Sequence, residues 1–559
     1  MRRWFGAVAL WLVPVLAWGQ SLDPARIAQP LSEHWLTYSG DYSGKRYSKL
    51  TQINAANVRN LTLAWVSRVT PGPGGGFGGR GGFGGGPPAI VGGEGTGEAT
   101  GGGFGGASIR ASVLAVDGIL YLSTPDNAWA MDARDGRILW HYFWKTKGGT
   151  HIGNRGLGMW RNWLYMETPD DYLVCLDAKT GKEKWHVEIA DFGQQYFSTM
   201  APIVVDNHVI VGTGDDLDAP GFLQSRDAET GALQWKWYTV PMQKGDPGLE
   251  TWASLDAARH GGGHTWVPGA YDPETRLYIF GTGNPTPAYT AQTRGEGDNL
   301  YTCALVAVHV DTGKMAWYYQ TSPHDTHDWD SSQTPILVDG EFKGRRRKMA
   351  VTAARNGFFF VVDRTTGEHL LTSSYSDTLN WTKGINAKGQ PIRDPEKDHH
   401  IGGALVSPPA GGVTNWQPPA FNPDTGLFYV PSTESYAMFY LTETDPRGAM
   451  GLGGTDQENV ASLGGYLTAI DYKTGKVAWR HRYPGVGGSI GNGILTTASR
   501  LIFAGDLGGN LVSYDAANGR VLWHSRIGQI SNAPQTYMLD GHQYILVAAG
   551  DTLYAFTLY

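Results

Sequence analysis

Cysteine is scarce in this chain of 559 residues, which contains only Cys175 and Cys303. Both lie in apolar, strand-like stretches, LVCLD and YTCALVAV, so we expect buried free thiols and no disulfide framework. The sequence also lacks a CxxCH motif. We therefore expect that the chain carries no c-type haem of its own.

Long apolar runs are missing after the N-terminal region, so no membrane span is expected. The N-terminus has the pattern of an export signal, with a basic start (MRR), an apolar run from Phe5 to Trp18 and small residues around Ala17 and Gly19. We expect residues 1–19 to be cleaved and residues 20–559 to form the mature protein in the periplasm. No Cys follows the apolar run, which disfavours a lipid anchor.

Positive charge is not in excess, because 45 Lys and Arg face 52 Asp and Glu, a formal net charge of -7. Loss of the two signal arginines makes the mature chain about 9 negative, so nucleic acid is not expected as a partner. With 41% apolar and 17% charged residues, the chain can bury a large core. From Gly72 to Gly106, 20 of 35 residues are Gly, which predicts a flexible surface insert at 72–106.

What the sequence does contain is a repeat. Seven segments share an apolar strand ending in small residues, a turn, a second strand and a D-x-x-T/D/N-G turn, usually with Trp four residues later. They end at Trp140, Trp185, Trp235, Trp317, Leu371, Trp479 and Trp523. Period-two alternation and Gly-containing turns make each unit a small antiparallel sheet.

The spacing of about 45 residues favours stacked units in a propeller. The C-terminal YILVAAGDTLYAFTLY begins an eighth unit, and LTLAWV with Trp65 near the N-terminus supplies its last strand. We therefore predict an all-β, eight-bladed β-propeller of four-stranded antiparallel blades, closed by strands from both termini. The repeated tryptophans are interpreted as packing residues between blades and not as a binding site.

Unusual polar residues follow the first strand of several repeats. Asp215 and Asp216 come after Gly212-Thr213-Gly214, Asn284 after Gly281-Thr282-Gly283, and Arg355 after Thr352-Ala353-Ala354. Because blades are related by rotation, these turns converge at one end of the axis. The sequence therefore predicts a central pocket there.

Carboxylates and imidazoles also gather in the stretch Arg294–Gln333, which ends in PHDTHDWDSSQ. Together with Asp216 and Asn284, its acids supply the oxygen ligands that a hard cation requires. Zinc bound by histidines is an alternative, although the spacing matches no closed zinc motif. The histidines concerned are His260, His264, His324 and His327.

Over nearly its whole mature length the chain resembles the quinoprotein alcohol dehydrogenases, which use pyrroloquinoline quinone (PQQ). The resemblance is carried by HWLTYSGDYSGKRYSKLTQINAANVRNLTLAW, the D-x-x-T-G-x-x-x-W units, GTGNPTP, GDNLYT and PHDTHDWD. It implies an eight-bladed propeller with PQQ in a funnel near the axis, coordinated to a metal ion.

The resemblance also implies roles for individual residues. Asp328 matches the catalytic base and, with Asp216 and Asn284, the metal site, while Asp330 resembles the extra ligand of lanthanide-using members; calcium or a lanthanide is therefore expected. The positions that match quinone contacts are Arg155, Arg355, Thr199, Thr213, Gly214, Trp266, Asn415 and Trp416. Without the predicted metal site, the residues alone would favour ion pairs between blades for the two arginines and packing between blades for Trp266.

Three features depart from the family pattern. Gly149 and Thr150 stand where the family has adjacent cysteines, Asp216 replaces a metal-binding Glu, and Arg110 replaces another Glu. These departures concern substrate and metal more than the fold.

The function implied is oxidation of a primary or secondary alcohol to an aldehyde or ketone, with Asp328 taking the hydroxyl proton while hydride passes to the quinone. Without a haem motif, electrons are expected to leave to a separate soluble cytochrome c. The alternatives are a cofactor-free propeller acting as a protein-binding scaffold and a PQQ enzyme for sugars or polyols. The polar segment from Thr372 to Gly412 is predicted to cover the funnel and shape specificity.

Overall fold

The computed structural model describes residues 21–72, 86–97, 108–148, 153–214, 217–331, 333–442, 455–485 and 491–559. The predicted signal peptide and most of the Gly-rich tract lie outside this range. Within it the chain is all-β, as predicted, and its one α-helix, α1 (Leu255–Arg259), is short. No helix of the described residues has the length and apolar character needed to cross a membrane.

Eight sheets of four or more strands make up the described chain, and seven of them use consecutive stretches of sequence. The first three sheets contain β3 (Ile90–Gly92), β4 (Leu114–Val116), β5 (Ile119–Thr124), β6 (Asn127–Asp132) and β7 (Ile138–Trp144); β8 (Gly158–Trp160), β9 (Trp163–Glu167), β10 (Tyr172–Asp177) and β11 (Glu183–Glu188); and β12 (Ile203–Val205), β13 (His208–Val211), β14 (Phe222–Asp227) and β15 (Leu233–Tyr238). The next two contain β16 (Ala270–Asp272), β17 (Leu277–Gly281), β18 (Ala304–His309) and β19 (Met315–Gln320); and β20 (Ile336–Phe342), β21 (Arg345–Ala353), β22 (Phe358–Asp363) and β23 (His369–Ser374). The last two contain β26 (Ala404–Val406), β27 (Ala420–Asn422), β28 (Leu427–Leu441), β29 (Thr455–Asp471) and β30 (Val477–Arg482); and β31 (Ile494–Thr497), β32 (Leu501–Gly505), β33 (Asn510–Asp515) and β34 (Val521–Arg526).

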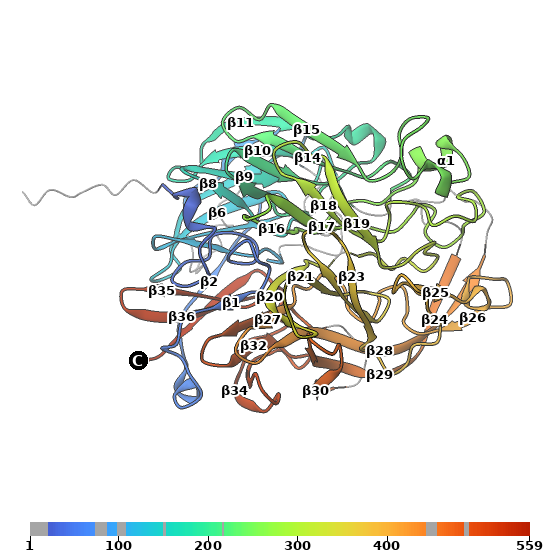
Figure 1. Cartoon of the computed structure of the whole chain (residues 1–559). Coiled ribbons are helices and arrows are strands. Elements are labelled where there is room, and N and C mark those ends of the chain that lie inside the picture. The colour runs from blue at the N-terminus through green and yellow to red at the C-terminus, as the bar shows by residue number, and fades with distance from the viewer. Residues whose placement is uncertain are drawn as a thin grey trace, which may run out of the picture.

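The eighth sheet joins the two ends of the chain. It pairs β2 (Thr62–Arg68) with β37 (Thr552–Thr557), followed by β36 (His542–Ala549) and β35 (Gln535–Leu539). Figure 1 shows the sheets following one another around the molecule in chain order, with the red C-terminal strands beside the blue β2.

The remaining elements are short. β1 (Tyr47–Ser48) pairs in parallel with β31, and β24 (Thr382–Ile385) with β25 (Pro391–Arg393) forms a separate ribbon. Five 3-10 turns are η1 (Pro24–Arg26), η2 (Val58–Asn60), η3 (Phe192–Gln194), η4 (Leu249–Thr251) and η5 (Pro395–Lys397).

The D-x-x-T-G turns form because their side chains bond their own backbone. After β10, the Asp177 carboxylate accepts the Thr180 N–H at 2.8 Å and the Thr180 hydroxyl at 2.7 Å. Gly181 has φ +70°, which glycine adopts without the steric penalty that a Cβ brings. The turn thus reverses the chain into β11.

Each of these glycines also receives a tryptophan from the preceding sheet. A Cβ at Gly181 would lie 2.6 Å from the ring of Trp140, and one at Gly313 would lie 2.5 Å from Trp235. The Trp235 indole N–H donates to the Val310 carbonyl at 2.7 Å. The packing role predicted for the repeated tryptophans is confirmed at these positions. The predicted buried free thiols, Cys175 and Cys303, are confirmed as well.

The N-terminal segment, residues 22–50, crosses one end of the sheets and bonds to the first strand of most of them. Its partners include Ala115 of β4, Val204 of β12, Tyr271 of β16, Leu337 of β20, Phe421 of β27, Thr496 of β31 and Met538 of β35. Within it the Arg46 guanidinium, 1% exposed, donates to the carbonyls of Ile494, Tyr38 and Pro534. One segment therefore ties sheets from the whole chain together.

Candidate active site

The polar residues predicted to converge do meet at the other end of the sheets. Asn284 follows β17, Arg355 follows β21, and Asp328 and Asp330 lie in the loop after β19. Arg355 donates to Asp328 Oδ2 at 3.1 Å and forms a second ion pair with Asp330 Oδ2. The Asn284 N–H donates to Asp330 Oδ1. Two neighbouring sheets, β16–β19 and β20–β23, thus supply one cluster.

The two aspartates differ in access. The Asp330 side chain is 0% exposed, whereas that of Asp328 retains 13% exposure. The Arg355 Nη2 that bonds Asp328 also donates to the Ala410 carbonyl at 2.7 Å, which further fixes the guanidinium. Of the two side chains, that of Asp328 is therefore the more accessible from solvent.

The acids and histidines of this loop are arranged mainly by Asp325. Its Oδ2 accepts the N–H of His327 at 3.2 Å and of Trp329 at 3.1 Å, and burial raises the Asp325 pKa to about 6. His327 stacks on Trp329 with ring centroids 4.4 Å apart. Asp328, between them, takes φ 65°, a conformation that non-glycine residues rarely adopt. Asp325 shapes the loop that presents Asp328.

The oxygen donors of the cluster fit a hard cation. Asn284 is 2% exposed, and its Oδ1 has no hydrogen-bond partner among the described residues. A buried acceptor of this kind is normally satisfied by a donor or a cation. Carboxylate and amide oxygens of Asn284, Asp328 and Asp330 form a ligand set suited to calcium or a lanthanide. Asp216, the remaining predicted ligand, lies outside the described residues.

A second cluster places one arginine against two indoles. The Arg155 guanidinium lies 4.6 Å from the ring centroid of Trp266 and 5.0 Å from that of Trp416. Its Nη1 donates to the carbonyls of Thr199 at 2.9 Å and Trp266 at 3.2 Å. Trp266 is 4% exposed, and its indole N–H lacks a partner in the described part of the chain. Flat faces beside a buried cation suit a planar, acidic group such as PQQ.

Asn415 bonds to the backbone of its own loop. Its amide donates to the Gly411 carbonyl at 3.0 Å, and its Oδ1 accepts the Trp416 N–H at 2.8 Å. Asn415 therefore holds the loop that carries Trp416.

Thr213 and Gly214 line the same region from the end of β13. The Thr213 hydroxyl lies 2.8 Å from His264 Nδ1, and burial lowers the His264 pKa to about 4. At Gly214 a Cβ would stand 2.3 Å from the Phe197 ring, so only glycine allows this close approach. Both residues occupy fixed, buried positions.

Glu167 was not expected from the sequence. It is 0% exposed, accepts the Ser198 hydroxyl and accepts the Gly212 N–H at 3.2 Å. Burial raises its pKa to about 8, in opposition to these hydrogen bonds. Glu167 thus ties together the chain segments that carry Thr199 and Thr213, and no sequence pattern marks it because its partners come from another sheet.

The histidines proposed for zinc bond to separate groups. His260 pairs with Asp218 at 3.0 Å, His264 with Thr213, His324 with the Gly297 carbonyl at 2.7 Å and His327 with the Lys397 carbonyl at 2.8 Å. Within the described ranges no three His, Cys, Asp or Glu side chains form a metal-binding group. The zinc alternative has no geometric support there.

The segment from Thr372 to Gly412 packs on the cluster. Asp398 accepts the Thr326 hydroxyl at 2.8 Å, and the Pro409 carbonyl accepts the Trp329 indole N–H at 3.1 Å. Pro409 and Gly412 of this segment, with Ser462, help to line a hollow of 740 Å³.

Arg110, a departure from the family pattern, lines a second hollow of 530 Å³ beside Trp416, and burial lowers its pKa. Gly149 and Thr150 lie outside the described residues.

Comparison with known proteins identifies the family. A model described as glucose/ethanol/alcohol dehydrogenase, beta-propeller domain, of the PQQ type, matches residues 35–374. The quinohemoprotein alcohol dehydrogenase ADH-IIG of Pseudomonas putida is 33% identical, over 95% of this chain and 74% of its own. The chain belongs to the family of PQQ-dependent alcohol dehydrogenases. It is an oxidoreductase that acts on alcohols.

Two further similar proteins are named without reference to haem. The quinoprotein alcohol dehydrogenase PedH of Pseudomonas putida is 33% identical, with 91% of this chain and 84% of its own length covered. The solved structure of a europium-containing methanol dehydrogenase matches with TM-score 0.79 and 26% identity, covering 94% of this chain and 98% of that one. A second family model, that of the outer membrane protein assembly factor BamB, matches residues 463–558, the C-terminal part of the chain.

Proposed function

We propose that the enzyme oxidises a primary or secondary alcohol in the periplasm, with PQQ and a metal ion bound at the cluster of Asn284, Asp328 and Asp330. The observation that carries this proposal is the partly exposed carboxylate of Asp328 beside the buried Arg355 and Asp330. A separate cytochrome c is proposed as the electron acceptor; the printed sequence contains no CxxCH motif.

The sheets are proposed to be the eight blades of one ring. Tryptophan docking links most successive sheets, from Trp65 against Gly136 to Trp479 against Gly519, and Leu371 with Ser373 takes this place against Gly475. Between the last two sheets, Trp523 contacts Phe556 with ring centroids 5.3 Å apart. Because β2 and β37 share a sheet, these contacts return to their starting point.

The residues that would hold the cofactor fall into two groups. Arg155 and Arg355 would bind its acidic groups, Trp266 and Trp416 its flat faces, and Thr199, Thr213 and Gly214 its rim. Asn284, Asp328 and Asp330, together with Asp216, would hold calcium or a lanthanide. When bound, the metal-coordinated quinone supplies the electrophilic hydride acceptor.

Asp328 performs the proton transfer. Arg355, 3.1 Å away, orients the carboxylate by a charge-assisted hydrogen bond. The carboxylate accepts the hydroxyl proton of the alcohol as the C–H bond is broken. Trp329, anchored to Pro409, and the segment Thr372–Gly412 exclude bulk water on one side and determine which alcohols fit.

The test compares the mature protein with Asp328→Asn after loading with PQQ and, separately, calcium or a light lanthanide. We expect dye-linked alcohol oxidation by the unmodified chain and a loss of 100-fold or more in kcat for the variant, in the range typical of a general base, about 10²–10⁴-fold. Retained quinone absorbance would show that the variant still binds the cofactor. Full activity of Asp328→Asn would show that another group is the base.

The same preparation separates the alternatives. Oxidation of glucose or polyols with no turnover of simple alcohols would support the sugar enzyme. Failure to retain quinone with either metal would instead support the scaffold function.

A further inference from the structure

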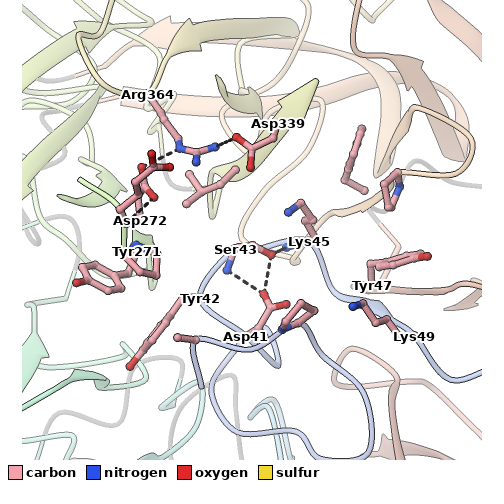
Figure 2. Close-up of a pocket in the computed structure, with 17 residues that line it drawn as sticks. Asp41, Tyr42, Ser43, Lys45, Tyr47, Lys49, Tyr271, Asp272, Asp339 and Arg364 are labelled. Atoms are coloured by element: carbon pink, nitrogen blue, oxygen red, sulfur yellow. Dashed lines mark hydrogen bonds and ion pairs between the residues drawn. The ribbon is translucent and has the colours of Figure 1, made fainter. Parts of the chain in front are cut away.

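A second cavity lies beneath the N-terminal segment. It has a volume of 470 Å³ and lies between residues 28–49 and the sheets that begin with β16, β20 and β27. Figure 2 shows Arg364 with Asp272 and Asp339 on one side, Tyr42 and Tyr271 on another, and Lys45, Tyr47 and Lys49 on the wall made by the N-terminal segment.

This cavity is far from the candidate active site. Asn284 follows the C-terminal end of β17, whereas Asp272 and Glu274 of the cavity precede its N-terminal end. The strand spans five residues, which separates the two ends by about 17 Å at roughly 3.3 Å per residue. The two sites therefore lie at opposite ends of the same sheet.

The acidic residues of the cavity already have partners. Arg364 donates to Asp272 at 2.9 Å and to Asp339 at 2.6 Å. Asp41 accepts the Leu31 N–H at 3.2 Å and the Ser43 N–H at 2.8 Å. Glu274 forms an ion pair with Lys348. The negative charge of the cavity is thus largely compensated within the protein.

The two lysines of the cavity are not compensated in this way. No described carboxylate lies within the 4.0 Å ion-pair distance of Lys45 or Lys49. Lys45 is partly buried, and burial lowers its pKa against the attraction of Asp41 and Asp339. An ammonium group held in partly buried surroundings without a bonded anion favours the entry of one.

The rest of the wall is apolar. Six residues from both the N-terminal segment and the sheets supply it: Ala28, Pro30, Pro273, Leu337, Phe421 and Pro423. Tyr42 and Tyr271 add an edge-to-face pair with ring centroids 5.1 Å apart. A volume of this size lies within the range of small-molecule sites, about 300–1,000 Å³.

We propose that this cavity is a second ligand site, which binds a small organic carboxylate with an apolar or aromatic body. Lys45 receives the carboxylate, Lys49 at the rim attracts it, and the prolines and Phe421 enclose its body. The Ser43 carbonyl accepts the Leu337 N–H of β20, and the Lys45 carbonyl accepts the Phe421 N–H of β27. A ligand bound at Lys45 would therefore stabilise the contact between the N-terminal segment and these two sheets.

The test uses benzoate as the probe and benzamide, which has the same shape without the charge, as its control. Binding to the full mature protein is measured by calorimetry and thermal unfolding, before and after loading with PQQ and metal. We expect saturable 1:1 binding of benzoate, a raised melting temperature and at least tenfold weaker binding of benzamide. Equal affinities for the two probes, or loss of benzoate binding after PQQ loading, would overturn the proposal.

Variants locate the site. Lys45→Met should weaken benzoate binding at least tenfold, and Lys45→Arg, which keeps the charge, should retain it within about threefold. Lys244→Met is the matched control, because Lys244 is exposed and does not line the cavity; it should bind benzoate unchanged. Unaltered affinity of a folded Lys45→Met protein would refute the assignment. If that variant does not fold, the comparison of benzoate with benzamide on the unmodified chain decides the question.

Discussion

Replacing Arg46 tests whether the N-terminal segment holds the sheets together. Its guanidinium bonds carbonyls of three separate parts of the chain, at 2.8 Å to Ile494, 3.1 Å to Tyr38 and 2.8 Å to Pro534. It also lies 4.7 Å from the ring centroid of Trp35. Arg46→Met preserves much of the side-chain volume but removes every donor.

The magnitude follows from these contacts. Three charge-assisted bonds at about 1.5 kcal/mol each and a cation–π contact of about 1 kcal/mol sum to roughly 5–6 kcal/mol. Removing the guanidinium also removes the penalty for burying its charge, the same effect that lowers its pKa to about 10. We therefore expect a net loss of about 3 kcal/mol in the free energy of unfolding, largely because the Ile494 and Pro534 carbonyls lose this charged donor, whereas the Tyr38 carbonyl keeps the Ser112 hydroxyl.

Urea unfolding followed by tryptophan fluorescence measures this loss. Arg137→Met serves as the control, because Arg137 is 64% exposed and makes only a 3.6 Å surface ion pair with Asp132. The control should change stability by less than about 0.5 kcal/mol. A loss below about 1 kcal/mol for Arg46→Met would refute the view that this arginine locks the sheets.

Two further predictions concern the sheets and the buried acid beside the site. Glu167 holds a proton up to about pH 8 in the folded state but releases it near pH 4.5 when unfolded, so its contribution to stability falls by about 1.4 kcal/mol per unit as pH rises through this window. Glu167→Gln should lessen this decline in pH-dependent unfolding, and an unchanged profile would show that the carboxyl does not titrate there. Gly313→Ala, with φ +65° and a Cβ 2.5 Å from Trp235, should destabilise by about 1–3 kcal/mol. Gly344→Ala has a similar φ of +75° but no atom within 4 Å, so equal losses in both variants would mean that the close approach of Trp235 adds no cost to the backbone strain.

The residues of the candidate site that occupy equivalent positions in successive repeats could be predicted from the sequence. Asn284 and Arg355 stand at equivalent places after β17 and β21, so rotation between similar sheets was enough to predict their meeting. The structural role of Asp325 could not be predicted from the repeat. Its carboxyl caps two N–H groups of its own loop, and the sequence alone does not distinguish such a carboxylate from the proposed metal ligands Asp328 and Asp330, three and five residues later.

The chain by itself determined the all-β class, the docking tryptophans and the family, because alternation, turn glycines and motifs are local patterns that recur along the sequence. Only the tertiary structure decided that Glu167 joins the segments around Thr199 and Thr213 and that Arg46 bonds carbonyls from distant sheets. It also decided that Asp328 is reachable while Asp330 is enclosed. These properties depend on which groups from different sheets share a buried space, and burial and charge compensation have no signature in the order of residues along one strand.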